Sequence, residues 1–301
     1  MPDSKRFLRP EAARRVARLE LKARRVVEGF LSGMHRSPYF GQSIEFLQHR
    51  QYVAGDDIRH IDWKVWGRQD RLHIKQYEEE TNFRMHLLVD SSASMNYGSG
   101  EENKFEYASS IAASLAFLAN RQQDATGLIT FDDKIRRNLS PRTSRYQLAR
   151  ILDALDGASQ NSTTDLFSIV REVAESVPRR GVIVLISDLL GVGDSLVKSL
   201  SLLRKRGHDV IVFQTLHDEE MEFPFSGATR FEGLESEQFL NCNPRALREG
   251  YLEALNAFLE NTRRACARLS IEYELVRTNQ PLDAVLAKFL SARSNMPTLK
   301  G

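Results

Sequence analysis

This sequence has few cysteines and no long apolar runs. Of its 301 residues only Cys242 and Cys266 are cysteines, and they lie far apart without a C-x-x-C pattern. We therefore expect reduced thiols rather than a disulfide framework. The longest apolar run, GVIVLISDLLGVG, is interrupted by Asp188 and is too short to span a bilayer, and no secretory segment follows Met1. We expect a soluble, cytoplasmic protein without stable membrane insertion.

The sequence also lacks an excess of charge of one sign. Its 42 basic and 40 acidic residues leave a formal net charge of +2, so no overall field favours nucleic acid or an anionic membrane as a partner. The most basic segment is an N-terminal helix whose arginines are interspersed with glutamates. Such a face is typical of a solvated helix, and we expect no nucleic-acid partner.

Common catalytic motifs are absent as well. The chain has no G-x-x-x-x-G-K-[ST] loop, no G-x-S-x-G elbow, and no H-E-x-x-H among its seven histidines. These absences exclude the usual nucleotide-binding, serine hydrolase and zinc protease signatures. We therefore expect a protein that is not an enzyme and leaves ATP hydrolysis to a partner.

Apolar periodicity divides the chain into three parts. Residues 10–33 show one apolar helical face, formed by Val16, Leu19, Ala23, Val26 and Phe30. Residues 34–82 are rich in Gly, Asp, aromatic and charged residues, which predicts short strands and turns. We expect residues 1–82 to form an N-terminal extension packed on a core domain at 83–293, followed by a tail at 294–301.

The core domain alternates between strand and helix patterns. Strands are predicted at 85–89, 126–131, 134–139, 182–187, 209–216 and 271–276. Helices are predicted at 103–120, 143–154, 166–177, 195–206, 244–268 and 282–292, with an irregular stretch at 217–242. This alternation predicts an α/β fold with a doubly wound, mostly parallel sheet covered by helices on both faces.

Two of the predicted core strands end in aspartate. The runs MHLLVD and GVIVLISD are almost continuously apolar, as expected for central parallel strands, and they end at Asp90 and Asp188. In open α/β sheets, ligands bind in the crevice at the carboxyl ends of the strands. We therefore expect the two carboxylates to converge there.

Hydroxyl side chains accompany these aspartates. Ser92 and Ser94 follow Asp90 at the second and fourth positions, and Thr164 precedes another predicted helix. Carboxylate and hydroxyl oxygens are hard ligands that suit Mg²⁺ or Mn²⁺. The competing interpretation is ordinary turn chemistry, with the serines serving as helix N-caps.

At these residues the sequence resembles the von Willebrand factor A fold and its metal-ion-dependent adhesion site, D-x-S-x-S followed by a distant Thr and a distant Asp. The resemblance implies that Ser92, Ser94 and Thr164 bind the cation through their hydroxyls. It further implies that Asp90 and Asp188 act directly or through water, and that a partner's carboxylate fills the remaining position.

A second resemblance rests on YVAGDDIRHIDW, residues 52–63, which matches the pattern Y-x-x-G-D-D-x-R-x-I-D-W. At this motif the sequence resembles an uncharacterised bacterial family whose members have a von Willebrand factor A-like domain. Members of that family are typically encoded beside MoxR-type AAA+ ATPases. The resemblance extends over residues 10–293 and implies two partners, the ATPase and an unknown protein client.

The acidic part of this motif leaves two interpretations open. Asp56, Asp57, Arg59 and Asp62 either hold a second metal or catalytic carboxylate pair, or form a turn with an Arg–Asp ion pair. In the second interpretation Trp63 and Trp66 pack the extension on the core.

Two functions are therefore considered. The first is a metal-dependent adaptor that binds a carboxylate on another protein. The alternative is a metal-dependent hydrolase or phosphatase that uses the same strand-end carboxylates. Phosphatases of the haloacid dehalogenase type need an acid two residues after the first aspartate, and here that position is Ser92. The sequence thus favours the adaptor.

Overall fold

The computed structural model describes residues 10–32, 43–53, 63–69, 72–80, 84–156, 165–177, 180–193, 195–234 and 239–294. These residues form two units. The larger unit contains residues 10–32 together with 84–294, and the smaller contains residues 43–80. No helix in the described ranges has the length and apolar character needed to cross a membrane.

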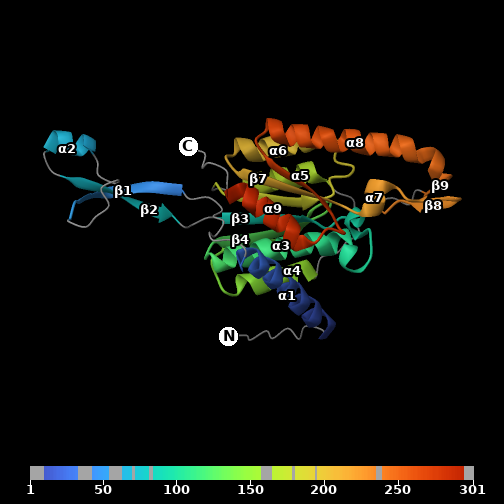
Figure 1. Ribbon diagram of the computed structural model, residues 1–301, viewed down its shortest axis with the longest axis horizontal. Helices are drawn as coiled ribbons and strands as arrows, with labels where there is room; N and C mark the ends of the chain where they lie inside the picture. Colours follow the sequence, from blue (N-terminus) through green and yellow to red (C-terminus); the bar gives the residue numbers. More distant parts are fainter. Residues whose placement is uncertain are drawn as a thin grey trace. The chain divides into compact units, whose positions relative to one another are not determined.

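The larger unit is built on a six-stranded sheet of order β10-β7-β6-β3-β4-β5 (Figure 1). All neighbouring strands pair in parallel except β4 and β5, which are antiparallel. The strands are β3 (Arg84–Asp90), β4 (Ala125–Phe131), β5 (Ile135–Arg142), β6 (Val182–Ser187), β7 (Asp209–Leu216) and β10 (Glu272–Arg277). The chain proceeds from β3 to β4 on one side and later places β6 on the other side. The switch point of the sheet therefore lies at β3.

Helices cover both faces of this sheet (Figure 1). One layer contains α3 (Lys104–Arg121), α4 (Gln147–Asp156) and α9 (Leu282–Ser294), and the other contains α5 (Leu166–Ser176), α6 (Ser195–Lys205) and α8 (Pro244–Arg268). The doubly wound, mostly parallel α/β fold predicted from the sequence is thus confirmed.

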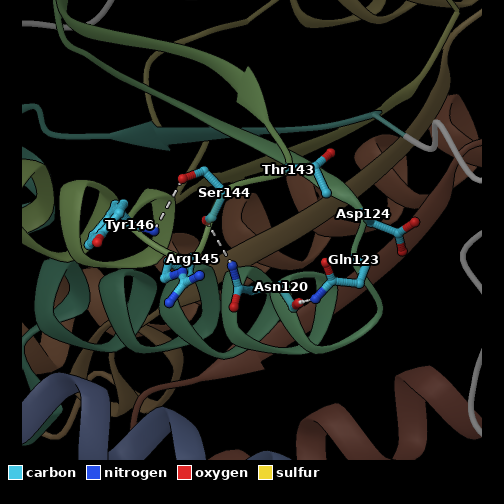
Figure 2. Close-up of a pocket in the computed structure, with 7 residues that line it drawn as sticks. All are labelled: Asn120, Gln123, Asp124, Thr143, Ser144, Arg145 and Tyr146. Carbon is cyan, nitrogen blue, oxygen red and sulfur yellow. Dashed lines mark hydrogen bonds between the residues drawn. The ribbon is translucent and has the colours of Figure 1, made fainter.

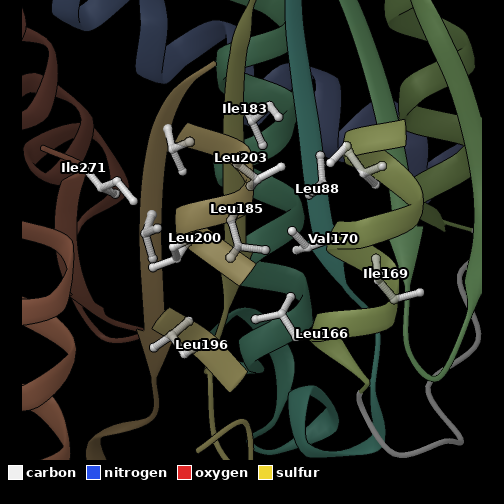
Figure 3. Close-up of a cluster of buried hydrophobic side chains, with 14 of the residues drawn as sticks. Leu88, Leu166, Ile169, Val170, Ile183, Leu185, Leu196, Leu200, Leu203 and Ile271 are labelled. Atoms are coloured by element: carbon white, nitrogen blue, oxygen red, sulfur yellow. The ribbon is translucent and has the colours of Figure 1, made fainter. Parts of the chain in front are cut away.

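Apolar side chains fill the space between the sheet and α5 and α6. Figure 3 shows Leu88 and Leu185 of the sheet together with Leu200 of α6 in one buried cluster. All three are fully buried, and full burial of a leucine stabilises the fold by about 1.5–3 kcal/mol. This packing explains the almost continuous apolar runs of β3 and β6, which have neighbours on both faces.

Helix α1 (Pro10–Ser32) belongs to the larger unit and packs on α3, α4 and α9. Its predicted apolar face is the buried one, because Ala23 lies in a cluster with Ala113 of α3 and Leu152 of α4. Val16 and Leu19 pack against this cluster, and Val26 is also buried. The side chain of Phe30 lies outside the described residues.

The stretch predicted to be irregular, 217–242, contains three short elements in its described parts, 217–234 and 239–242. They are α7 (Asp218–Glu222), β8 (Thr229–Glu232) and β9 (Phe239–Cys242), the last two forming an antiparallel hairpin. Elements of four or five residues are too short to show a helical or strand period. The irregular assignment was therefore wrong for these residues.

The smaller unit is an antiparallel pair, β1 (Ser43–Gln51) with β2 (His73–Glu80), joined by a connection that contains α2 (Trp63–Gln69). Short strands were predicted here. Trp63 and Trp66 are 60% and 45% exposed and contact each other edge to face. The packing of this segment on the core domain stays a prediction. Asp56, Asp57, Arg59 and Asp62, with their two proposed roles, lie outside the described residues.

Candidate functional site

The two strand-end aspartates lie next to each other at the switch point of the sheet. Asp90 ends β3 and Asp188 follows β6, and these strands are paired neighbours. Both residues are only 1% exposed. Burial, with the nearby negative charge of Asp188, raises the pKa of Asp90 to about 7, although hydrogen bonds from Ser187 and Ser92 oppose the rise. The structure therefore brings these two predicted site residues together.

Hydrogen bonds fix the carboxylate of Asp90. Its Oδ1 accepts from the backbone N–H of Ser92 at 2.9 Å, and its Oδ2 accepts from Oγ of Ser187 at 2.6 Å. Ser187, which the sequence reasoning missed, also accepts from the backbone N–H of Leu189 at 3.0 Å. The sequence signal that could have identified Ser187 as a site residue is its position directly before Asp188, at the end of a predicted strand.

The two serine hydroxyls form a hydrogen bond with each other, with 3.1 Å between Oγ of Ser92 and Oγ of Ser94. Ser92 precedes the short 3₁₀ helix η2 (Ala93–Asn96), but its side chain makes no capping hydrogen bond to that helix. The side chain of Ser92 therefore does not act as an N-cap of η2, which was the alternative interpretation.

This spacing fits a magnesium-type ion. Two adjacent ligands of an octahedral ion at about 2.1 Å lie about 3.0 Å from each other. The distance between the Ser92 and Ser94 oxygens matches that value. Within the described ranges, no three His, Cys, Asp or Glu side chains gather as a metal cluster.

Thr164, the third predicted hydroxyl, lies outside the described residues. The next residue, Asp165, donates its backbone N–H to the carbonyl of Asp132 at 3.3 Å, just beyond the carboxyl end of β4. Its side chain also caps α5 by accepting from the backbone N–H of Ser168. The described start of α5 is therefore attached to the carboxyl edge of the sheet, which is the edge that carries Asp90.

Lys104 is the main site residue that the sequence reasoning missed. Its side chain is fully buried, and Nζ lies 2.7 Å from Oδ2 of Asp188 and 2.7 Å from Oε1 of Glu220. Burial by itself lowers the pKa of Lys104, but the charges of Asp188 and Glu220 outweigh it and the pKa is raised. A lysine near the start of the helix predicted at 103–120 gives no sequence signal, because lysines are usually exposed.

Glu220 is held rigidly within α7. Its Oε2 accepts from the backbone N–H of His217 at 2.8 Å, and this contact is part of a capping box at the start of the helix. Its backbone carbonyl accepts from the hydroxyl of Tyr251 at 2.9 Å. Tyr97, just after η2, donates its hydroxyl to Glu219 at 2.6 Å. Helix α7 therefore borders the site and is tied to the loop that carries the serines.

The buried charges around the site do not cancel. Asp90, Asp188 and Glu220 contribute three negative charges when ionised, and Lys104 contributes one positive charge. When all four groups are ionised, negative charge therefore exceeds positive charge at this edge of the sheet. A divalent cation bound here would add positive charge beside these carboxylates.

Another buried carboxylate at the same edge is already paired. Asp132 follows β4, and its two oxygens accept from Nε of Arg136 at 2.7 and 2.6 Å. Asp132 is fully buried, while the Arg136 side chain is partly exposed. We assign this pair to the structure of the turn between β4 and β5.

A polar hollow of about 440 Å³ lies at the opposite edge of the sheet, where β4 begins (Figure 2). Asn120 donates to the carbonyl of Ser144 at 3.1 Å, and burial raises the pKa of Asp124 to about 6. The lining residues are Asn120, Gln123, Asp124, Thr143, Ser144, Arg145 and Tyr146. None of them belongs to the predicted cation site.

Several solved structures are similar to this chain. An aerotolerance-related membrane protein from Bacteroides fragilis gives a TM-score of 0.48 at 17% identity, covering 71% of this chain and 98% of that one. BatB from Bacteroides thetaiotaomicron gives 0.47 at 15% identity, covering 71% of this chain and 100% of that one. The VWA domain of SpRpn10 gives 0.39 at 12% identity, covering 68% of this chain and 93% of that one.

Sequence comparison gives relatives of nearly the same length. Uncharacterized proteins of Mycobacterium tuberculosis and Mycobacterium bovis are 26% identical over 289 residues, which cover 94% of this chain and 90% of each relative. The family described as "Protein of unknown function DUF58" matches residues 48–259. That match spans more than half of the sequence and includes Lys104 and all five predicted site positions, four of which lie among the described residues. The chain therefore belongs to the DUF58 family.

Proposed function

We propose that this protein is a metal-dependent protein–protein interaction module that binds a partner's carboxylate through a Mg²⁺ or Mn²⁺ ion. The observation that carries the proposal is the pair of hydroxyl oxygens of Ser92 and Ser94, 3.1 Å apart, beside two buried strand-end aspartates. Ser92, Ser94, Asp90 and Asp188 would hold the ion, with Thr164 as the third hydroxyl ligand that the sequence predicts.

The ligand types determine what such an ion can do. When bound, the ion supplies a Lewis acid that attracts an incoming carboxylate. Hydroxyl ligands are neutral and leave much of its charge uncompensated, while Ser187 and the backbone of Ser92 keep the Asp90 carboxylate oriented.

The proposed partners come from the sequence resemblance. We propose that the protein acts as an adaptor between a MoxR-type AAA+ ATPase and a protein client, in the cytoplasm. The absence of a P-loop in the sequence is consistent with leaving ATP hydrolysis to the partner.

A co-purification experiment tests this function. The tagged protein is co-expressed with the MoxR-type ATPase and captured with Mg²⁺ or with a chelator, and the retained ATPase is quantified. We expect chelation to release the ATPase from wild type, and Thr164→Ala to release it in either condition. Because both changes remove one interaction, chelation should add little to the variant.

The adjacent Thr163 provides a matched control. Thr163→Ala changes the neighbouring threonine but removes none of the predicted ligands, and it should retain the ATPase when Mg²⁺ is present. A complex that survives both the chelator and Thr164→Ala would overturn the proposed function.

A further inference from the structure

The buried position of Lys104 is unfavourable for a lysine on two counts. Transferring an ammonium from water to the protein interior costs several kcal/mol, as an order of magnitude. Lys104 is also the first residue of α3, directly after the N-cap Asn103, and the positive end of a helix dipole repels a cation. Helix α3 therefore does not explain why the Lys104 ammonium lies at this buried position.

The carboxylates around Lys104 do explain it. Nζ contacts Oδ2 of Asp188 and Oε1 of Glu220, both at 2.7 Å, and lies 6.0 Å from the centre of the Tyr97 ring. These partners come from three segments far apart in the chain. Lys104 therefore joins the proposed cation site to α7.

We propose that Lys104 is a built-in cation of the site, which neutralises Asp188 and Glu220 and thereby sets how strongly the site attracts a divalent ion. This inference rests on the proposed function. The ammonium of Lys104 offsets negative charge on Asp188 and Glu220, and its removal would leave both carboxylates without that positive charge. The lysine holds Asp188 in place and lowers the affinity for metal.

The geometry of Asp188 supports this role. Its Oδ1 accepts from the backbone N–H of Leu190 at 2.9 Å, while its Oδ2 accepts from Lys104. One oxygen is thus held by backbone and the other by the ammonium. A divalent ion that interacts with Asp188 must share this carboxylate with a positive charge that is already present, and like charges repel strongly in a buried site.

The test compares Mn²⁺ binding to wild type, Lys104→Met and the control Lys198→Met, using Mn²⁺ electron paramagnetic resonance and thermal melting. Lys198 is exposed on α6, so its replacement should leave Mn²⁺ affinity unchanged. We expect Lys104→Met to bind Mn²⁺ at least about tenfold more tightly than wild type. Its melting temperature should rise more with Mn²⁺ than that of wild type, because the ion replaces the missing positive charge.

Each outcome decides the inference. Equal or weaker Mn²⁺ binding by Lys104→Met would overturn it, and so would a variant that fails to fold with or without Mn²⁺. A variant that folds only when Mn²⁺ is present would support it.

The same measurements separate this inference from the proposed function. Binding by both proteins with equal affinity overturns only the role of Lys104. Binding by Lys104→Met but not by wild type supports that role and overturns the metal dependence of the natural protein. No binding by either protein overturns both.

Discussion

The ammonium of Lys104 lies 2.7 Å from Oδ2 of Asp188, although the two residues are 84 positions apart in the chain. This contact puts a fixed positive charge beside the predicted metal ligands. It also connects them to Glu220, which lies 116 positions from Lys104.

The first prediction concerns metal stoichiometry. Wild type should bind one Mn²⁺ per chain, and Ser92→Ala with Ser94→Ala should weaken that binding by about tenfold or more, because two of the hydroxyl ligands are lost. Isothermal titration calorimetry measures both values. Ser199→Ala is the control, since Ser199 is a buried serine whose hydroxyl donates within α6. Unchanged binding in the double variant would contradict the site.

The second prediction concerns the buried ion pair. Glu220→Gln should lower the free energy of unfolding by about 3 kcal/mol, because it removes one of two charges that compensate a buried ammonium. Urea denaturation measures the change. Glu222→Gln on the same helix is the control: its side chain is 62% exposed, and an exposed pair contributes at most about 1 kcal/mol. Equal effects of the two changes would show that burial of the pair has no energetic consequence.

The third prediction concerns acid stability. Burial, together with the positive charges of His208 and Arg84, lowers the pKa of His86 to about 4. The unfolded chain therefore binds a proton below pH 6.5 that the folded chain does not. Stability should be full above pH 6.5 and should fall by up to about 3 kcal/mol as the pH is lowered towards 4.

The matching experiment compares wild type with His86→Gln between pH 7.5 and 4.5, using urea unfolding. The variant should show a smaller loss of stability with acid. The difference between the two proteins is the informative quantity, because the raised pKa of Asp90 acts in the opposite direction in both. Identical pH profiles would exclude a contribution from His86.

The fourth prediction concerns the N-terminal helix. Ala23 of α1 is 1% exposed and packs with Ala113 and Leu152. Ala23→Asp should lower the unfolding free energy by about 3 kcal/mol or more, since it buries an unpaired carboxylate. Leu21→Asp is the control, because Leu21 is 49% exposed on the same helix. Comparable melting temperatures for the two variants would contradict the packing of α1.

The same packing predicts the result of truncation. A chain without residues 1–82 should aggregate, because it loses the helix that covers Ala113 and Leu152. Size-exclusion chromatography and thermal melting test this. A soluble 83–301 fragment that melts cooperatively would show that the core domain folds without the extension.

The fifth prediction concerns activity. With Mg²⁺ present, the purified protein should show no ATPase, phosphatase or esterase turnover above background, because the sequence supplies no nucleophile and base at the required spacing. Colorimetric assays with ATP and p-nitrophenyl esters measure this. Turnover that depends on metal and disappears in Ser92→Ala would favour the hydrolase alternative.

The sequence by itself determined the architecture of the core domain. The apolar runs of β3 and β6 predicted buried parallel strands, and the predicted helix at 244–268 and strand at 209–216 coincide with α8 and β7. These signals are local, since each depends on the spacing of apolar residues within one element. The same apolar runs placed Asp90 and Asp188 at the ends of their strands. The carboxyl ends of parallel strands lie at one edge of the sheet, so the two residues were expected there.

Only the tertiary structure decided what surrounds those carboxylates. The contacts of Lys104 with Asp188 and Glu220 depend on which strands become neighbours and on where α7 returns to the sheet. Periodicity carries no information about pairs separated by 84 and 116 positions, and a lysine at a helix start looks exposed in the sequence. Folding pairs the three residues because an ammonium and two carboxylates withdrawn from water are stable only in contact with one another.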